Sequence, residues 1–431
     1  MTTIAIFSHG HPFYSKGGGE VVAFNSFRAM RRGNLNAYLY CAVNQDLKPE
    51  YNLFAAHEHL LEFKAREYLF PARKLDLFLC AHNHRAFFPA LIRKLSEQKI
   101  DVFHFHHFWS VGTDLIVQLM ECFPAAKFVL TLHELLAICL RDGQMVKNKT
   151  DELCFRPSDI ECHMCFPQFD KDQFRARRLF LSEFLQRFDL LISPSAFVAK
   201  RIQEWGVEKE VHVIENGYTA PSAAPQVDAD DEVITRRFAF FGQPTPFKGL
   251  DIFVSAASQV SRGDVTFSVY GCDRRKFVEQ FGPQWDVVID NMAGRLQFLG
   301  PYDPRSVFQL MQHNGWIVIP SIWWENSPLV IQESFLVGRP PIVADIGGMR
   351  EKVENGVNGL HFTARNSAAL ASVMRRAAGN VDLWHNLRFG INPPPTMEEM
   401  TRLLTNLYAS VDKNASLAPV AQGNCERMRR L

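Results

Sequence analysis

The chain has 431 residues, of which 47% are hydrophobic and 22% charged, the balance of a water-soluble globular protein with room for two domains. Its 47 basic and 46 acidic side chains give a net charge of +1, so the excess of positive charge that marks nucleic-acid-binding proteins is absent and no nucleic-acid partner is expected. No apolar run reaches the roughly 18 residues of a membrane span, and nine cysteines without a secretory leader indicate mostly reduced thiols and a cytoplasmic location.

The N-terminal residues predict a strand, a glycine-rich turn and a helix. Residues 3–8 are apolar and lack the basic region and cleavage site of a signal peptide. Gly17, Gly18 and Gly19 then precede an amphipathic helix. Glycines at this place let backbone N–H groups approach a phosphate closely, although a flexible loop explains them equally well. Their spacing is not Gly-x-Gly-x-x-Gly, which argues against a nicotinamide enzyme.

Residues 57–99 are predicted to be helical, with basic and aromatic side chains mixed. Such a surface could rest on anionic lipid or bind a lipid-linked acceptor, which would place the protein at the inner face of the membrane as a peripheral partner. Ordinary amphipathic helices with solvated charges explain the same pattern and are the favoured interpretation. The side chains concerned are Phe63, Arg66, Tyr68, Phe70, Arg73, Lys74, Phe87, Phe88, Arg93 and Lys94.

Two further predicted strands end in histidines. Residues 101–106 run into His106 and His107, and residues 127–132 lead to His133. Ligands of open α/β sheets bind beyond the carboxyl ends of the strands. His133 is therefore the candidate catalytic residue of this half of the chain, with helix capping as the alternative role.

An insertion over about residues 137–170 contains four cysteines. Cys162 and Cys165 have the two-residue spacing of a zinc-ligand pair, whereas Cys139 and Cys154 are too far apart for a standard zinc ribbon. The four thiols are the candidate ligands of a structural zinc, with His163 as a substitute ligand. A disulfide pair or free thiols are the alternatives, and no metal is expected to take part in catalysis.

The order of predicted elements divides the chain into two α/β domains. The first occupies residues 1–218, and a proline-rich, acidic linker follows at 219–232. A second series of strands and helices covers 233–395, and a last helix and tail cover 396–431. Alternating strands and helices predict two doubly wound sheets.

The clearest chemical pattern of the C-terminal half begins after a buried apolar strand at 316–320. Ser327 is the predicted N-cap of the next helix and Pro328 its first residue, where a missing N–H costs nothing. The unpaired N–H groups of Leu329 and Val330 would then form a phosphate site.

Two carboxylates flank this predicted phosphate site. Glu325, followed by Asn326, lies on the loop before the helix, and Glu333 lies one to two turns inside it. Each carboxylate could accept hydrogen bonds from a vicinal diol, one on a ribose and one on a hexose. This arrangement predicts a nucleotide-sugar site, whereas a glutamate that only favours the helix dipole is the simpler alternative.

The pair of glutamates, together with the stretches Gly338–Ala344 and Gly347–Glu351, resembles the donor half of glycosyltransferase family 4. The resemblance extends from the first strand to about residue 390. It implies the GT-B fold, in which two Rossmann-like domains face one another across a cleft, with the acceptor on the first domain and the nucleotide sugar on the second. It also implies a retaining, metal-independent hexosyltransferase that moves sugar from a UDP- or GDP-linked donor to a glycan or lipid-linked acceptor, in surface polysaccharide or glycoconjugate synthesis.

The resemblance implies roles for individual residues as well. The glycines at 17–19 would lie over the donor diphosphate, and His133 would face the donor sugar. Family members usually hold the leaving diphosphate with an arginine and a lysine ahead of the helix near residue 250. Lys248 matches the lysine, but Gln243 stands where arginine is commonest, so one cation is missing. Glu325 would orient the sugar hydroxyls.

Two other classes of function are compatible with the same residues. A nucleotide-sugar epimerase or hydrolase would bind the same donor without an acceptor. A non-catalytic nucleotide-binding scaffold would also retain the fold, and the glutamine at position 243 mildly favours it.

Overall fold

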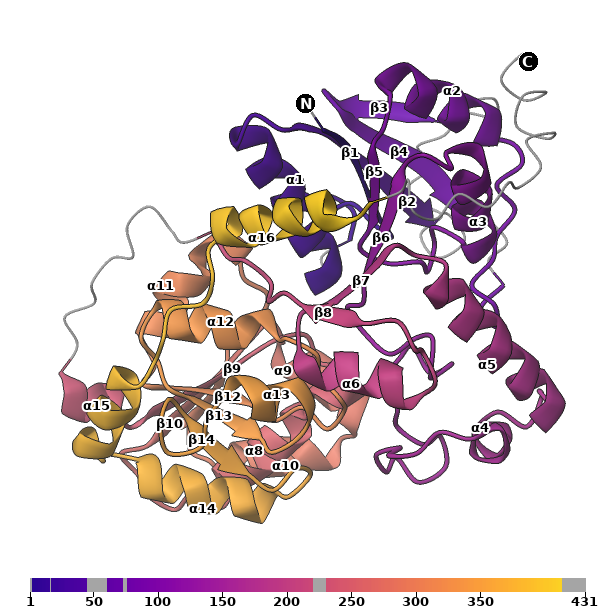
Figure 1. Cartoon of the computed structure of the whole chain (residues 1–431). Helices are drawn as coiled ribbons and strands as arrows, with labels where there is room; N and C mark the ends of the chain where they lie inside the picture. Colours follow the sequence, from indigo (N-terminus) through magenta and orange to yellow (C-terminus); the bar gives the residue numbers. More distant parts are fainter. Residues whose placement is uncertain (1, 16, 45–59, 73–75, 220–229, 413–431) are drawn as a thin grey trace. The chain divides into compact units, whose positions relative to one another are not determined.

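The computed structural model describes residues 2–15, 17–44, 60–72, 76–219 and 230–412. Contacts between residues divide the chain into two compact units, one comprising Met1–Thr219 with Pro395–Leu431 and the other Ala220–Pro394. Each unit contains one sheet with helices packed against it (Figure 1). The predicted α/β class is confirmed for both, while the cleft between them stays a prediction.

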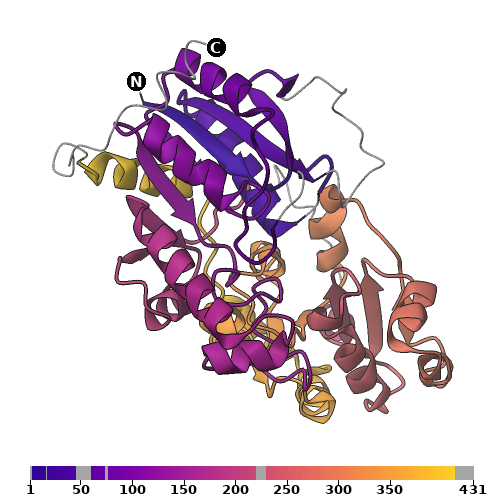
Figure 2. The same cartoon turned by 90° about the vertical axis from the view of Figure 1, so that its right-hand side faces the viewer.

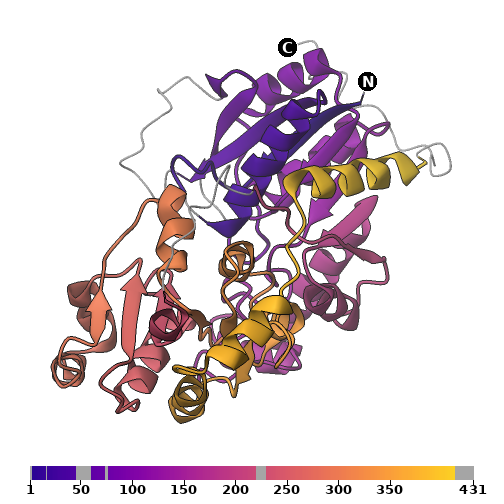
Figure 3. The same cartoon turned by 90° about the vertical axis from the view of Figure 1, so that its left-hand side faces the viewer.

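The sheet of the N-terminal unit has eight strands in the order β3-β4-β2-β1-β5-β6-β7-β8. All neighbours pair in parallel except β3 and β4. Figures 2 and 3 show helices on opposite faces of this sheet, which is why its central strands are buried on both sides and read as continuous apolar runs. The strands are β1 (Thr3–Ser8), β2 (Asn36–Asn44), β3 (Leu61–Lys64), β4 (Glu67–Ala72), β5 (Val102–Phe105), β6 (Lys127–Thr131), β7 (Leu190–Ser193) and β8 (Val211–Val213).

The helices of this unit include one from the far end of the chain. Helix α16 packs beside α1 (Figure 1), and its start is stabilised by a capping box in which Thr396 and Glu399 exchange hydrogen bonds. Asp170 and Gln173 cap α5 in the same way. The helices are α1 (Gly18–Arg32), α2 (Phe88–Gln98), α3 (Thr113–Cys122), α4 (Asp159–Cys165), α5 (Lys171–Gln186), α6 (Ala196–Glu204) and α16 (Met397–Ser410).

The helical prediction for residues 57–99 is wrong over most of its length. This stretch contributes strands β3 and β4 and only one helix, α2. Tyr68, Phe70, Phe87 and Phe88 are buried in the core, so the described residues do not form the mixed basic and aromatic surface on which the membrane contact depended. Strand β4 is buried on both faces and has no alternating pattern, which removes the signal that would have separated it from a helix. Positions 57–59 and 73–75 lie outside the described residues.

The sheet of the C-terminal unit has six parallel strands in the order β11-β10-β9-β12-β13-β14. Trp316 and Trp384 fill its core, and their indole nitrogens donate hydrogen bonds to the carbonyls of Thr235 and Gly315. The strands are β9 (Arg237–Phe241), β10 (Thr266–Tyr270), β11 (Leu296–Phe298), β12 (Trp316–Ile319), β13 (Pro341–Ala344) and β14 (Leu360–Phe362).

Short helices connect these strands. Two are single 3₁₀ turns, η1 (Pro246–Lys248) and η2 (Pro304–Ser306). The α-helices are α7 (Asp231–Ile234), α8 (Leu250–Ser258), α9 (Arg274–Phe281), α10 (Gln284–Asp290), α11 (Val307–Gln312), α12 (Leu329–Leu336), α13 (Gly347–Lys352), α14 (Ser367–Ala377) and α15 (Val381–Phe389). The predicted linker at 219–232 falls mostly outside the described residues. No helix in the described ranges is long and apolar enough to cross a bilayer.

Each sheet has one point at which the strand order reverses. In the N-terminal unit β1 lies between β2 and β5, and in the C-terminal unit β9 lies between β10 and β12. The loops that leave neighbouring strands at such a point diverge to opposite faces of the sheet and open a ligand site. Lys248 and Glu325 follow β9 and β12, and the glycines at 17–19 follow β1, whereas His133 follows β6, the next strand beyond β5.

Candidate active site

In the C-terminal unit, Glu325 and Lys248 come together beyond β12. One carboxylate oxygen of Glu325, Oε1, lies 2.6 Å from Lys248 Nζ and 2.8 Å from Ser321 Oγ. The Glu325 side chain is only 7% exposed, so these partners offset the cost of burying its charge. The lysine ammonium also lies 5.6 Å from the centre of the Trp323 ring. The other oxygen of Glu325 accepts no hydrogen bond from the described residues.

Two glycines hold the backbone on either side of this pair. Gly249 has φ +67°, and a Cβ there would lie 2.0 Å from the carbonyl oxygen of Pro320. A Cβ on Gly348 would lie 1.5 Å from the carbonyl oxygen of Asn326. The Gly348 N–H donates to the Glu325 carbonyl over 2.8 Å. A side chain at either position would push the loop outward.

The start of α12 differs slightly from its prediction. Pro328 occupies the cap position and Leu329 is the first helical residue, so the assignment of Ser327 as N-cap and of Pro328 as first helical residue is wrong by one residue. The N–H groups of Leu329 and Val330 donate to no group in the described part of the chain, as predicted for a phosphate site. Ser327 Oγ and Trp323 Nε1 are buried and lack partners among the same residues, which a bound ligand would supply.

Glu333 lies in the second turn of α12 and is half-buried. Burial and the nearby charge of Glu333 raise the pKa of Tyr302. The Tyr302 ring meets Tyr270 and Phe241 edge-on at the ends of β10 and β9. Gln243, by contrast, is exposed just beyond β9. Glu333 therefore borders an aromatic patch of a kind that suits a nucleoside.

In the N-terminal unit, His133 faces a second histidine. His106 Nδ1 lies 3.0 Å from His133 Nε2, and the two rings are nearly parallel. His107 Nε2 lies 2.8 Å from Glu134 Oε1. These side chains follow β5 and β6, which are adjacent strands, so the topology brings together the histidines that the sequence separates by 27 residues.

The predicted glycine loop is the beginning of a helix. Gly17 is the N-cap of α1, and Gly18 and Gly19 are its first residues. A Cβ at position 19 would lie 3.2 Å from His9 and 3.7 Å from His133. Glycine therefore allows both imidazole rings to lie directly against the helix start.

Glu20 is a buried carboxylate beside these rings. Burial opposes its ionisation, but hydrogen bonds with His9 and Ser15, together with the His9 charge, outweigh burial and lower the pKa of Glu20 to about 2. A Cβ on Gly17 would lie 2.2 Å from Glu20 Oε2. The glycine turn thus encloses an anion rather than leaving an open loop.

Three histidines of this unit are held neutral. Burial lowers the pKa of His104 and of His133 to about 3, with neighbouring His107 and His9 adding to the effect on His133. Burial also lowers the pKa of His106 far below its usual range. His104 Nδ1 forms a hydrogen bond of 2.6 Å with the hydroxyl of Tyr408 on α16, which connects the C-terminal helix to this cluster.

We expect acid to destabilise the N-terminal unit through these histidines. Between about pH 6.5 and pH 3 the unfolded chain binds a proton at each of these three histidines that the folded chain does not. Each of them therefore lowers the free energy of unfolding by about 1.4 kcal/mol per pH unit as the pH falls. Glu20 adds stability above its unfolded pKa that is lost as the pH falls toward 2. Calorimetry across this range measures the slope of the free energy of unfolding against pH, which His104→Gln should reduce by about 1.4 kcal/mol per pH unit. Equal melting temperatures at pH 7.5 and pH 5 would contradict the expectation.

The four cysteines of the insertion line one small cavity. Burial raises the pKa of Cys139 to about 11 and, with the other three thiols adding to it, that of Cys162 to about 12. Cys154 and Cys165 complete the group, and all four carry free thiols. Within the described ranges, however, no three potential ligands lie in an arrangement that could hold a metal ion. The structural zinc stays a prediction, which elemental analysis of the purified chain tests.

Sequence reasoning missed three residues of the C-terminal site. Ser321 and Trp323 lie between the end of β12 and Glu325, and Tyr302 lies just after β11. Their positions beyond the carboxyl ends of predicted strands were the available signal. Serine and tyrosine are too common in loops for that signal to single them out.

Two family models match the chain. The model described as Glycosyltransferase Family 4 matches residues 16–220, and the one described as Glycosyl transferases group 1 matches residues 235–380. Together they cover about four-fifths of the sequence. The chain belongs to glycosyltransferase family 4. The family resemblance predicted from the glutamates and glycines of the C-terminal half is thereby confirmed.

Individual relatives of this family 4 chain are distant. A D-inositol 3-phosphate glycosyltransferase from Jonesia denitrificans is 25% identical over 231 residues, covering 50% of this chain and 54% of that protein. One from Nocardia farcinica is 26% identical over 149 residues, covering 33% of each. The chain thus spans from a third to about half of the length of these curated relatives.

Solved structures share the fold over nearly the whole chain. Sucrose-phosphate synthase from Thermosynechococcus elongatus superposes with a TM-score of 0.70 and 17% identity, covering 95% of this chain and 98% of that one. Anabaena HepE in complex with UDP superposes with a TM-score of 0.64 and 18% identity, covering 95% and 100%. The fold of this family 4 chain is therefore GT-B.

Proposed function

We propose that this protein transfers a hexose from a UDP-sugar to a hydroxyl group of a glycan or lipid-linked acceptor. The observation that carries the proposal is the ion pair between buried Glu325 and partly exposed Lys248 at the switch point of the C-terminal sheet, beside the unsatisfied N–H groups of α12. These groups comprise a mobile cation, two backbone donors and a carboxylate with one unused oxygen. A diphosphate would pair with the cation and the two donors, and a sugar hydroxyl would donate to the carboxylate.

The residues suggest how the transfer proceeds. Lys248 turns from Glu325 toward the diphosphate and, with the N–H groups at the start of α12, stabilises the charge that grows on the leaving phosphate. Glu325 then binds hydroxyls of the sugar, and Glu333 binds the ribose. The leaving phosphate takes the proton of the acceptor hydroxyl on the same face of the sugar, so configuration is retained without a protein nucleophile. No step requires a metal ion.

The choice of UDP rests on the structural neighbours. HepE structures include complexes with UDP and with UDP-glucose, whereas GDP has no comparable support. The acceptor side is assigned to the N-terminal unit, where His133 lies beside His106 and against the start of α1. We place the activity in the cytoplasm, in the synthesis of surface polysaccharide or a related glycoconjugate.

Calorimetric titration tests the donor site. UDP should bind the wild-type chain and Glu333→Gln should weaken it by about tenfold or more, because the ribose diol loses a charged acceptor worth about 1.5–3 kcal/mol. GDP and NAD serve as competing ligands. Glu354→Gln, an exposed glutamate of the same unit, is the matched control.

The same preparation separates the alternatives. Release of free sugar or an epimerised donor without any acceptor would favour an epimerase or hydrolase. A folded chain that binds no nucleotide would overturn the donor site and leave a scaffold as the remaining interpretation.

A further inference from the structure

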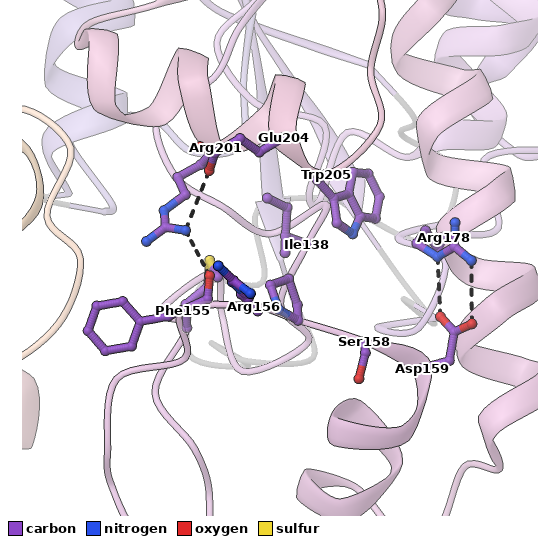
Figure 4. Close-up of a pocket in the computed structure, with 11 residues that line it drawn as sticks. Ile138, Phe155, Arg156, Ser158, Asp159, Arg178, Arg201, Glu204 and Trp205 are labelled. Atoms are coloured by element: carbon purple, nitrogen blue, oxygen red, sulfur yellow. Dashed lines mark hydrogen bonds and ion pairs between the residues drawn. The ribbon is translucent and has the colours of Figure 1, made fainter.

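The N-terminal unit contains a half-open pocket that the donor chemistry does not use. Its volume is about 740 Å³, which is within the range of small-ligand sites. Figure 4 shows residues from the cysteine insertion below and from α5 and α6 beside and above it. The lining consists of Ile138, Met145, Phe155, Arg156, Pro157, Ser158, Asp159, Arg178, Arg201, Glu204 and Trp205.

The charged side chains of this pocket leave a surplus cation. Arg178 forms a two-pronged ion pair with Asp159, with N–O distances of 3.2 and 3.4 Å. Arg201 donates to the Phe155 carbonyl over 2.8 Å and lies 3.6 Å from Glu204. Arg156 is exposed and forms no ion pair with any described residue. Three guanidinium groups therefore face two carboxylates, and the net charge of the lining favours an anion.

The rest of the lining is apolar and partly aromatic. In the view of Figure 4, Ile138 and the Trp205 ring lie between Arg201 and Arg178. Trp205 is half-buried at the end of α6, and Ile138 is buried. An aromatic ring beside guanidinium groups suits a ligand with both an apolar face and charged or hydroxyl groups. A sugar ring with a carboxylate or phosphate has this character.

The pocket lies close to the candidate histidine along the chain. Ile138 on its wall is five residues after His133, so their Cα atoms are at most about 18 Å apart. A short oligosaccharide can span that distance. The pocket and the cysteine cavity also share Ile138, Met145 and Pro157, so the insertion that contains the four thiols forms the floor of the pocket.

From these observations we propose that the pocket binds a distal part of the acceptor, and that the acceptor is an anionic glycan whose sugar units carry carboxylate or phosphate groups. The inference rests on the proposed function, because it takes the acceptor hydroxyl to lie near His133. It adds the chemical class of the acceptor and assigns its recognition to the insertion together with α5 and the end of α6. Arg156 provides the unpaired charge and Trp205 the stacking surface.

Binding of saccharides to the full chain tests the assignment without requiring transfer. The probes are tetragalacturonate, maltotetraose 6-phosphate and neutral maltotetraose, titrated calorimetrically. One or both anionic probes should bind, with the neutral one at least about tenfold weaker, as expected for loss of one charged contact. Arg156→Glu and Trp205→Ala should each weaken the anionic probe at least about tenfold. Arg175→Glu, an exposed arginine of α5 outside the pocket, should leave it within about twofold.

The outcomes separate this inference from the proposed function. Preference for only one anionic probe would identify the recognised group as carboxylate or phosphate. Failure of both to bind, equal binding of the neutral probe, or an equal effect of Arg175→Glu and Arg156→Glu would overturn the pocket assignment. Arg156 is exposed, so its variant remains informative even if Trp205→Ala does not fold. Saccharide binding without any UDP binding would instead overturn the transferase proposal and leave the anionic-saccharide site standing.

Discussion

Replacing Lys248 with methionine is expected to lower kcat for sugar transfer about 100- to 1,000-fold, the usual loss when one preorganised group that stabilises transition-state charge is removed. Family members commonly have two cations here, but Gln243 stands in the place of one. We therefore expect Lys248 to contribute a larger share of the stabilisation than a lysine in a two-cation site. Methionine has a similar length and preserves the apolar contacts of the stem, so the lost charge is the main change.

The variant Glu325→Gln measures how much the carboxylate of the Lys248–Glu325 pair contributes to kcat. Glutamine can still meet Ser321 and Lys248 but lacks the charge that holds the ammonium 2.6 Å away. We expect kcat to fall by a similar factor, and the double variant to lose much less than the product of the two, because both residues act in one network. Lys276→Met, an exposed lysine on α9, is the control. A Lys248→Met enzyme with kcat within about threefold of wild type would exclude the proposed role.

The second large loss of kcat is expected when His106 is replaced. We expect His106 to act as a positioning residue for His133. His106 is 2% exposed, and its Nε2 has no partner within the described residues. A buried N–H left unpaired costs more than an unpaired ring lone pair. The proton of His106 should therefore be on Nδ1, donated to His133 Nε2. His133 then holds its own proton on Nδ1 and can donate it to a ligand oxygen.

His106→Leu removes the hydrogen bond that fixes the tautomer of His133. We expect kcat to fall about 10- to 100-fold, which is the size of the loss when partners that orient functional histidines are removed. His106→Asn should recover part of the activity, since its amide can donate from nearly the place of Nδ1. Nitrogen-15 spectra of labelled histidine read the His133 tautomer directly: an Nδ1–H form in the wild type and a mixture in the leucine variant.

A buried histidine away from the site controls for lost stability. His82 is 4% exposed and bonds the Val111 carbonyl. His82→Leu should lower the melting temperature comparably while leaving kcat within about threefold. The positioning role would be excluded if the His133 tautomer were the same in wild type and His106→Leu.

The local sequence was sufficient to predict most of the secondary structure of the C-terminal unit. Runs such as Trp316–Ile319 and Pro341–Ala344 are strands because a parallel sheet covered on both faces accepts only apolar residues. The order of strands and helices determined the class of both sheets. The end of a predicted strand located His133, the start of a predicted helix located Glu325, and the family resemblance located Lys248. The same apolar character hid β4, because a strand buried on both sides has no period from which a helix can be excluded.

The pairings within the site required the tertiary structure. His106 and His133 are 27 residues apart, and Lys248 and Glu325 are 77 apart, yet each pair meets because strand order places their loops at one edge of a sheet. The phosphate contact predicted for the glycines at 17–19 stays a prediction, whereas packing shows that they form the helix start against which two imidazoles lie. Residue type and spacing thus determined which groups are available for chemistry. Which of them touch was decided by long-range strand pairing, which no local pattern encodes.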